Sequence, residues 1–250
     1  MTQGGRKKIG AVILAAGRGL RMGGDTNSLP KCLLSVGGET ILQFQLRALR
    51  WAGVDDVAIV TGYRAEAVHE EAKGRVAHFF HNADFDSTNS LYSFYCARSF
   101  AEGETLVINS DVVFHPALLT KLIEAPAPNA LLYDPKTNMG DEEMKVAVAA
   151  DGTVAHISKR MPPEQAAGEN LGIVRFGAGT AGVAFEILSQ GEPDRLRKQW
   201  LPECINQLRG VRAFHAIPIG GLPWTEVDFT EDLEFARRSI YAQCAAALHI

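Results

Sequence analysis

The chain has 250 residues and a mass of 27.1 kDa, with 46% hydrophobic and 22% charged residues. These ordinary values exclude global disorder and a collagen-like structure, and the length predicts one large domain or two small ones. The 25 basic and 29 acidic residues give a net charge of −4, which argues against a general nucleic-acid-binding surface.

The cysteine pattern argues against a disulfide framework or a structural zinc site. The four cysteines are Cys32, Cys96, Cys204 and Cys244. They lie far apart and form no CxxC pair, so reduced thiols in a cytoplasmic protein are the simplest interpretation.

The N-terminus resembles a signal peptide only superficially. Three basic residues at 6–8 precede the apolar run 9–16, but this run is short and continues into a glycine-rich basic loop. We interpret it as a first buried strand. No apolar stretch approaches the roughly 20 residues needed to span a bilayer, so we expect no membrane partner.

The first half of the chain alternates between predicted strands and helices. In chain order these are a strand at 9–14, a helix at 40–51, a strand at 57–60, a helix at 64–72, a strand at 76–80, a helix at 90–100, a strand at 105–108, a helix at 116–124 and a strand at 130–133. This alternation predicts right-handed βαβ units and a mostly parallel sheet.

The second half adds an antiparallel component. Asp151-Gly152 predicts a hairpin between strands at 144–150 and 154–158. There follow a strand at 173–176, helices at 180–188 and 195–208, a strand at 211–217 and a helix at 230–248 capped by Thr230. The predicted fold class is α/β: a Rossmann-like mixed, mostly parallel central sheet with helices on both faces, plus a small antiparallel hairpin.

The most informative segment is the loop after the first strand, 14–21, with the sequence LAAGRGLR. A loop that leaves a buried parallel strand lies at the carboxyl edge of the sheet, where ligands bind in open α/β folds. Gly17 and Gly19 allow backbone N–H groups to approach an anion. Arg21 can bind phosphate oxygens bidentately, and Lys31, after Pro30, adds a point charge. The loop therefore predicts a polyphosphate site.

Two other phosphate-binding motifs fit less well. A dinucleotide-binding GxGxxG fingerprint would require glycine where Met22 stands, and its helix would begin at the second glycine. Here the loop continues to Pro30, and no GxxxxGK[ST] sequence is present.

The string LAAGRGLR with Pro-Lys at 30–31 resembles the signature of nucleoside-triphosphate nucleotidyltransferases. It is most similar to the phosphocholine cytidylyltransferase-like branch, which includes phosphonate and phosphoglutamine cytidylyltransferases. The similarity covers nearly the whole chain and includes Thr-Gly-Tyr at 61–63, Asn-Ser-Leu-Tyr-Ser at 89–93, Asn-Ser-Asp at 109–111, Glu-Met-Lys-Val at 143–146 and Trp-Thr-Glu-Val-Asp at 224–228. The segment 23–29 departs from the family, whose members often carry a Leu-Thr-Pro type sequence there.

The resemblance implies a single domain of the nucleotide-diphospho-sugar transferase type over residues 1–250. Its nucleotide-binding half would cover about 9–133 and its acceptor-binding half about 134–250. The implied nucleotide-binding residues are Leu14, Ala15, Ala16, Gly17, Gly19, Arg21, Lys31, Gly62, Asn89 and Ser90. The implied catalytic residues are Arg21, Lys31, Asp111 and Asp228.

Two of these residues suit a magnesium ion. Asp111 follows the strand at 105–108, and Asp228 directly precedes the last helix. Mg²⁺ prefers one or two carboxylates together with substrate phosphates and water. The resemblance assigns Mg²⁺, with Mn²⁺ as a substitute, to this pair.

The predicted acceptor-binding residues are Lys145, Lys159, Glu169, Tyr92 and Glu226. Lys159 matches only partly a Glu-Lys-Pro segment that contacts the acceptor phosphate in related sugar-phosphate enzymes. A solvated lysine on a strand edge is the alternative for Lys145 and Lys159. Glu226 is either a ligand of a substrate ammonium group or a solvated carboxylate.

The expected function is a Mg²⁺-dependent transfer of CMP from CTP to a small phosphorylated or phosphonylated acceptor, with release of pyrophosphate. CTP is implied by the resemblance alone. Acidic residues at 141–143 and 169 are compatible with an amine-bearing acceptor. Formation of a homodimer is left open.

Several alternatives are weighed against this expectation. The first is a sugar-1-phosphate uridylyl- or guanylyltransferase. A molybdopterin guanylyltransferase fits less well, because its loop usually has two glycines where Ala16-Gly17 stands. A nucleotide-binding regulator would not require all four catalytic residues. A glycosyltransferase would typically show Asp-x-Asp where this chain has Asn-Ser-Asp at 109–111.

Overall fold

A computed structural model describes residues 8–19, 29–136, 139–191 and 194–249. Within these residues, nine strands form one sheet, whose main path has the order β10-β6-β9-β4-β1-β2-β3, with β7 and β8 attached through β9. The strands are β1 (Gly10–Ala15), β2 (Asp56–Thr61), β3 (His78–His81), β4 (Thr105–Asn109), β6 (Ala130–Asp134), β7 (Lys145–Val148), β8 (Val154–Ser158), β9 (Gly168–Phe176) and β10 (His215–Pro218).

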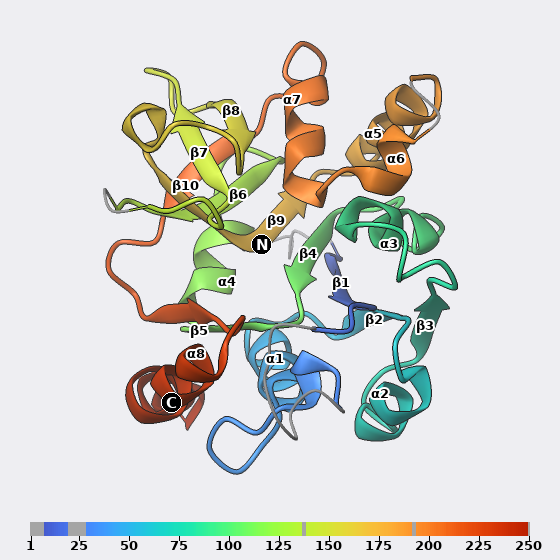
Figure 1. Cartoon of the computed structure of the whole chain (residues 1–250), viewed down its shortest axis with the longest axis vertical. Helices are drawn as coiled ribbons and strands as arrows, with labels where there is room; N and C mark the ends of the chain where they lie inside the picture. Colours follow the sequence, from blue (N-terminus) through green and yellow to red (C-terminus); the bar gives the residue numbers. More distant parts are fainter. Residues whose placement is uncertain (1–7, 20–28, 137–138, 192–193, 250) are drawn as a thin grey trace, which may run out of the picture.

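Along the main path of the sheet, only β9 runs against its neighbours. β4, β1, β2 and β3 are parallel, as are β10 and β6. β9 lies antiparallel between β4 and β6 and continues into the β7–β8 hairpin. The predicted mixed, mostly parallel sheet with an antiparallel hairpin is therefore confirmed (Figure 1).

Helices cover both faces of the sheet because the strand residues alternate between two cores. In β1, Ala11 and Ile13 belong to one buried cluster, while Val12 and Leu14 belong to the other. The first cluster packs under α1 (Ile41–Trp51), α2 (Ala65–Glu71) and α4 (Ala117–Ile123), and the second under α3 (Ser90–Cys96), α5 (Thr180–Ser189) and α7 (Ile205–Leu208). No helix in the described ranges is long and apolar enough to cross a bilayer.

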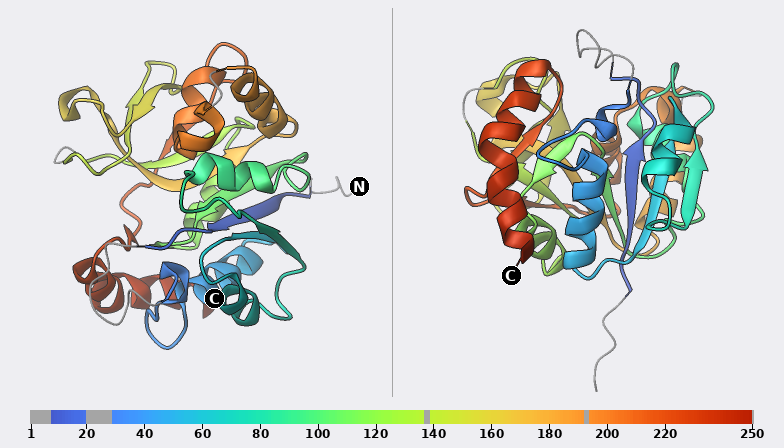
Figure 2. Two further views of the ribbon diagram at one scale, coloured as in Figure 1. Left: turned by 45° about the vertical axis from the view of Figure 1, so that its right-hand side comes forward. Right: turned by 90° about the horizontal axis from the view of Figure 1, so that it is seen from below.

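A second sheet of two strands lies at the carboxyl edge of the first. It pairs β5 (Val112–Phe114) with β11 (Trp224–Glu226) in antiparallel fashion. The C-terminal helical segment packs beside α1 and β5 through a third apolar cluster (Figure 2). Neither strand was predicted, because three residues are too few for a periodic pattern.

The C-terminal helical segment departs from the predicted helix at 230–248. It is divided into α8 (Thr230–Phe235), a π-helical turn (Ala236–Ile240), α9 (Tyr241–Ala246) and a 3₁₀ turn (Ala247–His249). Thr230 is its first residue and not its cap. The Asp232 carboxylate instead accepts hydrogen bonds from the backbone N–H groups of Asp228 (3.0 Å) and Phe229 (2.8 Å).

The predicted helix at 195–208 was wrong as a single element. The structure has α6 (Arg195–Lys198), a 3₁₀ turn (Leu201–Cys204) and α7, with extended backbone at Gln199 and Trp200. Pro202 cannot continue a helix begun at 195, because its ring would clash with the carbonyl of residue 198. The break places Trp200 on the surface of a cavity.

Several other boundaries also moved. β9 extends the predicted strand at 173–176 back to Gly168, and β10 begins at His215 instead of residue 211. α3 ends at Cys96, so residues 97–100 form turns. Remaining short elements are the 3₁₀ turns Lys31–Leu33 and Pro163–Gln165.

Candidate active site

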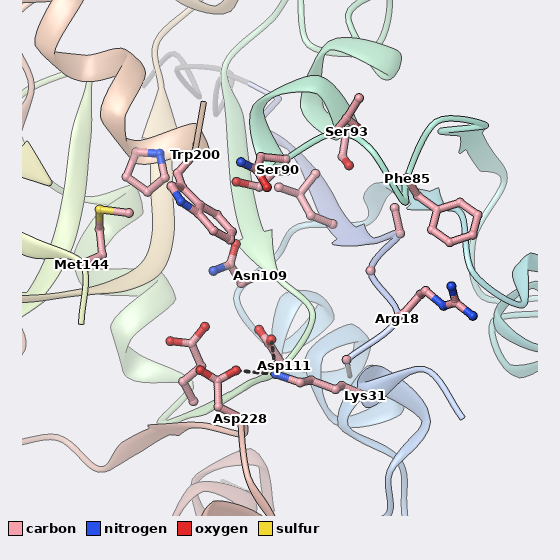
Figure 3. Close-up of a pocket in the computed structure, with 18 of the residues that line it drawn as sticks. Arg18, Lys31, Phe85, Ser90, Ser93, Asn109, Asp111, Met144, Trp200 and Asp228 are labelled. Carbon is pink, nitrogen blue, oxygen red and sulfur yellow. Dashed lines mark hydrogen bonds and ion pairs between the residues drawn. The ribbon is translucent and has the colours of Figure 1, made fainter. Parts of the chain in front are cut away.

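A cavity of about 450 Å³ opens where the carboxyl ends of β1 and β4 lie side by side. The predicted residues in its wall are Leu14, Ala16, Gly17, Gly19, Lys31, Asn89, Ser90, Asp111, Lys159, Glu226 and Asp228. They come from the end of β1 and the loop after it, the 3₁₀ turn at Lys31, the start of α3, the link between β4 and β5, the turn after β8, and the end of β11 with the segment before α8 (Figure 3). The sheet therefore brings together groups that are up to 214 residues apart in the chain, from Leu14 to Asp228.

The glycine loop at one end of the cavity comprises Gly17, Arg18 and Gly19. Gly19 has φ +63°, and a Cβ there would lie 2.6 Å from Cγ of Lys31. Glycine is thus required both by the backbone conformation and by the close approach of the Lys31 side chain. Because Gly19 has no side chain, the Lys31 side chain can pack directly against the backbone of the glycine loop.

Gly62 packs against the backbone at Ala16, just before the glycine loop, and does not line the cavity. A Cβ at Gly62 would lie 2.7 Å from the carbonyl oxygen of Ala16, and the neighbouring Tyr63 N–H donates to that same oxygen (3.0 Å). Ala15 also lies outside the wall, because strand alternation turns its side chain into the opposite core.

Lys31 lies between two carboxylates at the floor of the cavity. Its ammonium group forms ion pairs with Asp228 Oδ1 and, at 3.4 Å, with Asp111 Oδ2. The side chain of Lys31 is 12% exposed, against 21% for Asp111 and 28% for Asp228. Figure 3 shows the three groups meeting below the rest of the wall.

The small sheet explains why the two aspartates meet. Asp111 lies in the two-residue link between β4 and β5, and Glu226 of β11 pairs with Val112 of β5. The next residue, Val227, donates its N–H to the carbonyl oxygen of Asp111 (2.9 Å). Backbone pairing therefore places Asp228 next to Asp111, although 116 residues separate them.

The electrostatics of this cluster favour an additional positive charge. Burial would lower the pKa of Lys31, but Asp111 and Asp228 outweigh burial and raise it above its ordinary value. Burial raises the pKa of Asp111, with Lys31 opposing and Asp228 adding to that rise. Burial, together with Asp111 and Asp228, raises the pKa of Glu226 well above its usual range. One ammonium group therefore only partly compensates three carboxyl groups.

The acidic cluster has the ligand set of a hard divalent cation. One carboxylate oxygen each from Asp111, Glu226 and Asp228 lie within 4.8 Å of one another. Oxygen-only ligands suit Mg²⁺, Mn²⁺ or Ca²⁺ better than zinc or copper. The donor set thus fits the cation expected from the sequence.

The opposite end of the cavity, the Trp200 end, comprises Glu142, Met144, Lys159 and Trp200. The Lys159 ammonium lies 5.0 Å from the centre of the Trp200 ring and 3.8 Å from a Glu142 carboxylate oxygen. Figure 3 shows Met144 and Trp200 across the cavity from Arg18. A cation thus already lies against the aromatic face and the acid at this end.

Three predicted acceptor-binding residues do not line the cavity. Lys145 is 1% exposed and donates to the carbonyl oxygens of Lys159 (2.7 Å) and Glu143 (3.2 Å). The alternative of a solvated lysine is wrong for Lys145, because its side chain is buried, and contact with an acceptor stays a prediction. The Lys145 side chain therefore ties the segment before β7 to the turn after β8, next to two residues of the Trp200 end.

Glu169 and Tyr92 are also directed elsewhere. Glu169 is 7% exposed and forms an ion pair with Lys136. Burial raises its pKa, and Lys136 opposes this. The Tyr92 ring packs under the Arg197 guanidinium, 4.7 Å from its carbon, because the first turn of α3 directs position 92 away from the cavity.

Asn89 and Ser90, at the start of α3, line the cavity and also bind α6 and the 3₁₀ turn after it. Ser90 Oγ accepts the N–H of Leu201 at 2.9 Å, and the Asn89 N–H donates to the carbonyl oxygen of Arg197 at 2.8 Å. These contacts hold the turn that carries Trp200 against the start of α3.

Sequence reasoning missed several wall residues, among them Arg18, Asn109, Asn170 and Trp200. Arg18 lies in the glycine loop, pairs with Asp86 at 3.3 Å and has its guanidinium carbon 5.3 Å from the Tyr63 ring centre. Its place between two loop glycines was a usable signal. Trp200 had none, because it was assigned to a helix. The predicted residue Arg21 lies outside the described residues.

Comparison with known proteins agrees with this geometry. Residues 11–170 match the family model described as the MobA-like NTP transferase domain. The chain is 40% identical over 127 residues to a CMP-5'-(3-aminopropyl)phosphonate synthase of Streptomyces rubellomurinus, covering 49% of this chain and 20% of the relative. It is 33% identical over 133 residues to a CTP:phosphoglutamine cytidylyltransferase of Campylobacter jejuni, covering 50% and 53%. The matched segments thus span about half of these relatives or less.

The fold also has solved counterparts. The structure of an inositol-1-phosphate CTP transferase from T. maritima superposes with a TM-score of 0.76 at 18% identity, covering 94% of this chain and 98% of the other. The fold class and the family resemblance inferred from the sequence are therefore both confirmed. With a family model matching well over half of its length, this chain belongs to the MobA-like NTP transferase domain family.

Proposed function

We propose that the protein transfers CMP from CTP to a small phosphorylated or phosphonylated acceptor and releases pyrophosphate. The observation that carries this proposal is the placement of Lys31 between Asp111 and Asp228, directly beside the glycine loop. An ammonium group, a pair of carboxylates suited to a cation and exposed backbone N–H groups are the groups that position and neutralise a triphosphate.

The names of the relatives support the choice of CTP and of the acceptor class. One relative is named for a CMP-aminoalkylphosphonate product and another for CTP and phosphoglutamine. Both names combine a cytidine nucleotide with a small acceptor, and the solved counterpart is also named as a CTP transferase.

Asp111 and Asp228 are the proposed Mg²⁺ ligands, with Glu226 within reach of the same ion and Mn²⁺ as a substitute. The bound ion would supply charge neutralisation and orientation for the triphosphate. Lys31 would then direct its ammonium toward the phosphate oxygens, where negative charge builds up during transfer. Arg21 is proposed to bind the triphosphate, and Arg18 lies in the same loop.

The proposed reaction needs no general base. A phosphate or phosphonate oxygen of the acceptor, already ionised near pH 7, attacks the α-phosphorus of CTP. The new P–O bond forms as the bond from the α-phosphorus to the bridging oxygen breaks, and pyrophosphate leaves with that oxygen. The task of the protein is therefore to hold the two anions in line and to offset their charge.

The Trp200 end is proposed to bind the acceptor. The Trp200 ring and the nearby Glu142 carboxylate suit an ammonium group, and Lys159 suits a phosphate or phosphonate. The side chain of Asn170, which is 4% exposed and lines the cavity, adds an amide whose Oδ1 has no partner among the described residues.

A pyrophosphate-release screen tests the proposal. CTP, UTP, GTP and ATP are each combined with phosphocholine, phosphoethanolamine, an aminoalkylphosphonate or glucose-1-phosphate, and products are identified by mass spectrometry. We expect kcat/KM for CTP with an amine-bearing acceptor to exceed that of the other nucleotides by at least ~10-fold, because a mismatched base loses about one hydrogen bond. A preference for UTP with glucose-1-phosphate would contradict the proposal.

A further inference from the structure

One buried amide lies beneath the link that carries Asp111. Gln45 belongs to α1 and is fully buried, and most of the other buried residues of this helix are apolar. Burying a carboxamide in such surroundings costs free energy unless its polar atoms are hydrogen-bonded. The partners of Gln45 therefore indicate why an amide stands there.

Both hydrogen-bond partners of the Gln45 amide group flank Asp111. Gln45 Nε2 donates to the carbonyl oxygen of Asn109 at 2.9 Å and to that of Val112 at 2.8 Å. Asn109 is the last residue of β4 and Val112 is the first of β5, so the two bonds hold both ends of the two-residue link. β4 belongs to the large sheet and β5 to the small one, so Gln45 fixes the junction between them.

The orientation of the amide follows from these partners. Reversing it would point its oxygen at two carbonyl oxygens, so only the NH₂ group can face the link. Oε1 has no hydrogen-bond partner within the described part of the chain. Leaving this oxygen unpaired costs stability, so the contribution of Gln45 lies in the two bonds that its NH₂ group makes to the link.

We propose that Gln45 is a positioning residue that holds the Ser110–Asp111 link, and through it the Asp111 carboxylate, in place against Lys31 and Asp228. The second aspartate depends on the same link, because Val227 donates to the carbonyl oxygen of Asp111 and β11 pairs with β5. The kinetic consequence rests on the proposed function, whereas the consequence for cation binding does not.

The test compares Gln45→Met, which keeps the volume but removes the donors, with the wild type. We expect kcat to fall about 10–100-fold and the Kd for Mn²⁺, measured by electron paramagnetic resonance, to rise at least ~10-fold, the usual cost of losing an outer hydrogen bond at a metal ligand. The KM for CTP should change by less than about threefold, because Gln45 does not line the cavity. Hydrogen exchange should accelerate in the peptide spanning 105–114.

Asn129→Leu is the matched control. Asn129 is 4% exposed and bridges backbone groups at the opposite edge of the sheet, accepting from Gly177 N–H (2.8 Å) and donating to the Ala213 carbonyl (3.3 Å). We expect it to lose stability while kcat and Mn²⁺ affinity stay within about twofold of wild type. If Gln45→Met does not fold, Gln45→Asn, which retains a shorter amide, is expected to fold and to show the same losses.

Wild-type Mn²⁺ affinity and wild-type exchange in a folded Gln45 variant would overturn the positioning role. If the wild-type protein transferred no nucleotide to any acceptor, the proposed function would fail separately. Mn²⁺ binding and hydrogen exchange would still decide the role of Gln45, because neither measurement requires turnover.

Discussion

The glycine loop and the Trp200 end face each other across one cavity, but they are built differently. The glycine loop follows β1, Lys31 begins a 3₁₀ turn and Asp111 lies between two strands. Backbone geometry fixes these groups, and Gly19 at positive φ accommodates Lys31. The Trp200 end is assembled from side chains of the segment before β7, the turn after β8 and the break between α6 and the 3₁₀ turn Leu201–Cys204.

This difference suggests that the two ends of the cavity have different functions. A site fixed by backbone tolerates little change, because altering one residue moves the loop or the link as a whole. A site made of separate side chains can exchange Trp200 or Glu142 without disturbing the sheet. We therefore expect changes at the glycine-loop end to act on nucleotide transfer itself, and changes at the Trp200 end to act on the acceptor.

The largest effect should come from the carboxylates. Asp111→Ala and Asp228→Ala are each expected to lower kcat at least about 10²–10³-fold, because each removes a group aimed at the charged centre of the reaction. Steady-state pyrophosphate release measures the loss, and circular dichroism checks the fold. Glu234→Gln, which changes only an exposed pair with Arg238, is the control. Near-normal kcat in both aspartate variants would remove the basis for the two-carboxylate site.

The two ends also differ in how far they could be predicted. Asp111 was placed correctly at the cavity because it follows the parallel strand β4, and a residue there must lie at the carboxyl edge of the sheet. Lys31 and Asp228 also line the cavity, but the family resemblance, and not the strand pattern, assigned them to the same site. Their roles stay predictions. Arg21 cannot be judged, because it lies outside the described residues.

At the Trp200 end, the sequence placed the strands but not the side chains. Lys145 begins β7 and Lys159 directly follows its partner strand β8, yet Lys145 is buried and Lys159 lines the cavity, which depends on the cross-strand register. Trp200 was missed because the sequence pattern predicted one helix at 195–208, which Pro202 interrupts. The two-stranded sheet that joins Asp111 to Asp228 is a long-range pairing of three-residue strands, which local patterns do not reveal.

Lys31 offers the next largest effect and separates catalysis from binding. Lys31→Ala should lower kcat about 10²-fold with a smaller change in the KM for CTP, because the ammonium is placed to meet charge that grows during transfer. Arg21→Ala should raise the KM for CTP as well. Single-turnover rates at saturating CTP measure the difference, and a Lys31→Ala protein that turned over normally would show that the glycine-loop end has been misread.

Trp200→Leu tests the opposite end. We expect the KM for an amine-bearing acceptor to rise about 10-fold, the scale of a lost cation–π contact, while the KM for CTP is unchanged. Tyr92→Leu is the matched control, since its ring packs on Arg197 outside the cavity wall. Equal effects of the two substitutions, or an effect of Trp200→Leu on CTP instead, would contradict the division between the ends.

A smaller, purely structural effect is expected at Lys145. Lys145→Met leaves the partly buried carbonyl oxygens of Glu143 and Lys159 without this donor and should lower the free energy of unfolding by about 1–3 kcal/mol. Urea denaturation measures this. The acceptor KM should change less than in Lys159→Met, whose ammonium lies in the cavity wall. A Lys145→Met protein of normal stability but poor acceptor binding would restore the original prediction for this residue.

The smallest expected effect concerns His115, which lies at the end of the small sheet and not in the cavity. Burial lowers the pKa of His115, and its Nδ1 accepts the N–H of Ala117 at 3.2 Å at the start of α4. Because the folded pKa lies below the unfolded value of about 6.5, the unfolded chain takes up the proton more readily. The resulting stability is complete above the unfolded pKa and is lost as the pH falls from there through the lower folded pKa. We expect the difference in unfolding free energy between wild type and His115→Asn, which can still accept the helix N–H but does not titrate, to shift against the wild type between pH 7.5 and 5.5. Parallel pH profiles for the two proteins would show that His115 does not contribute, and kcat at pH 7.5 should be the same in both because this end of β5 lies away from Asp111.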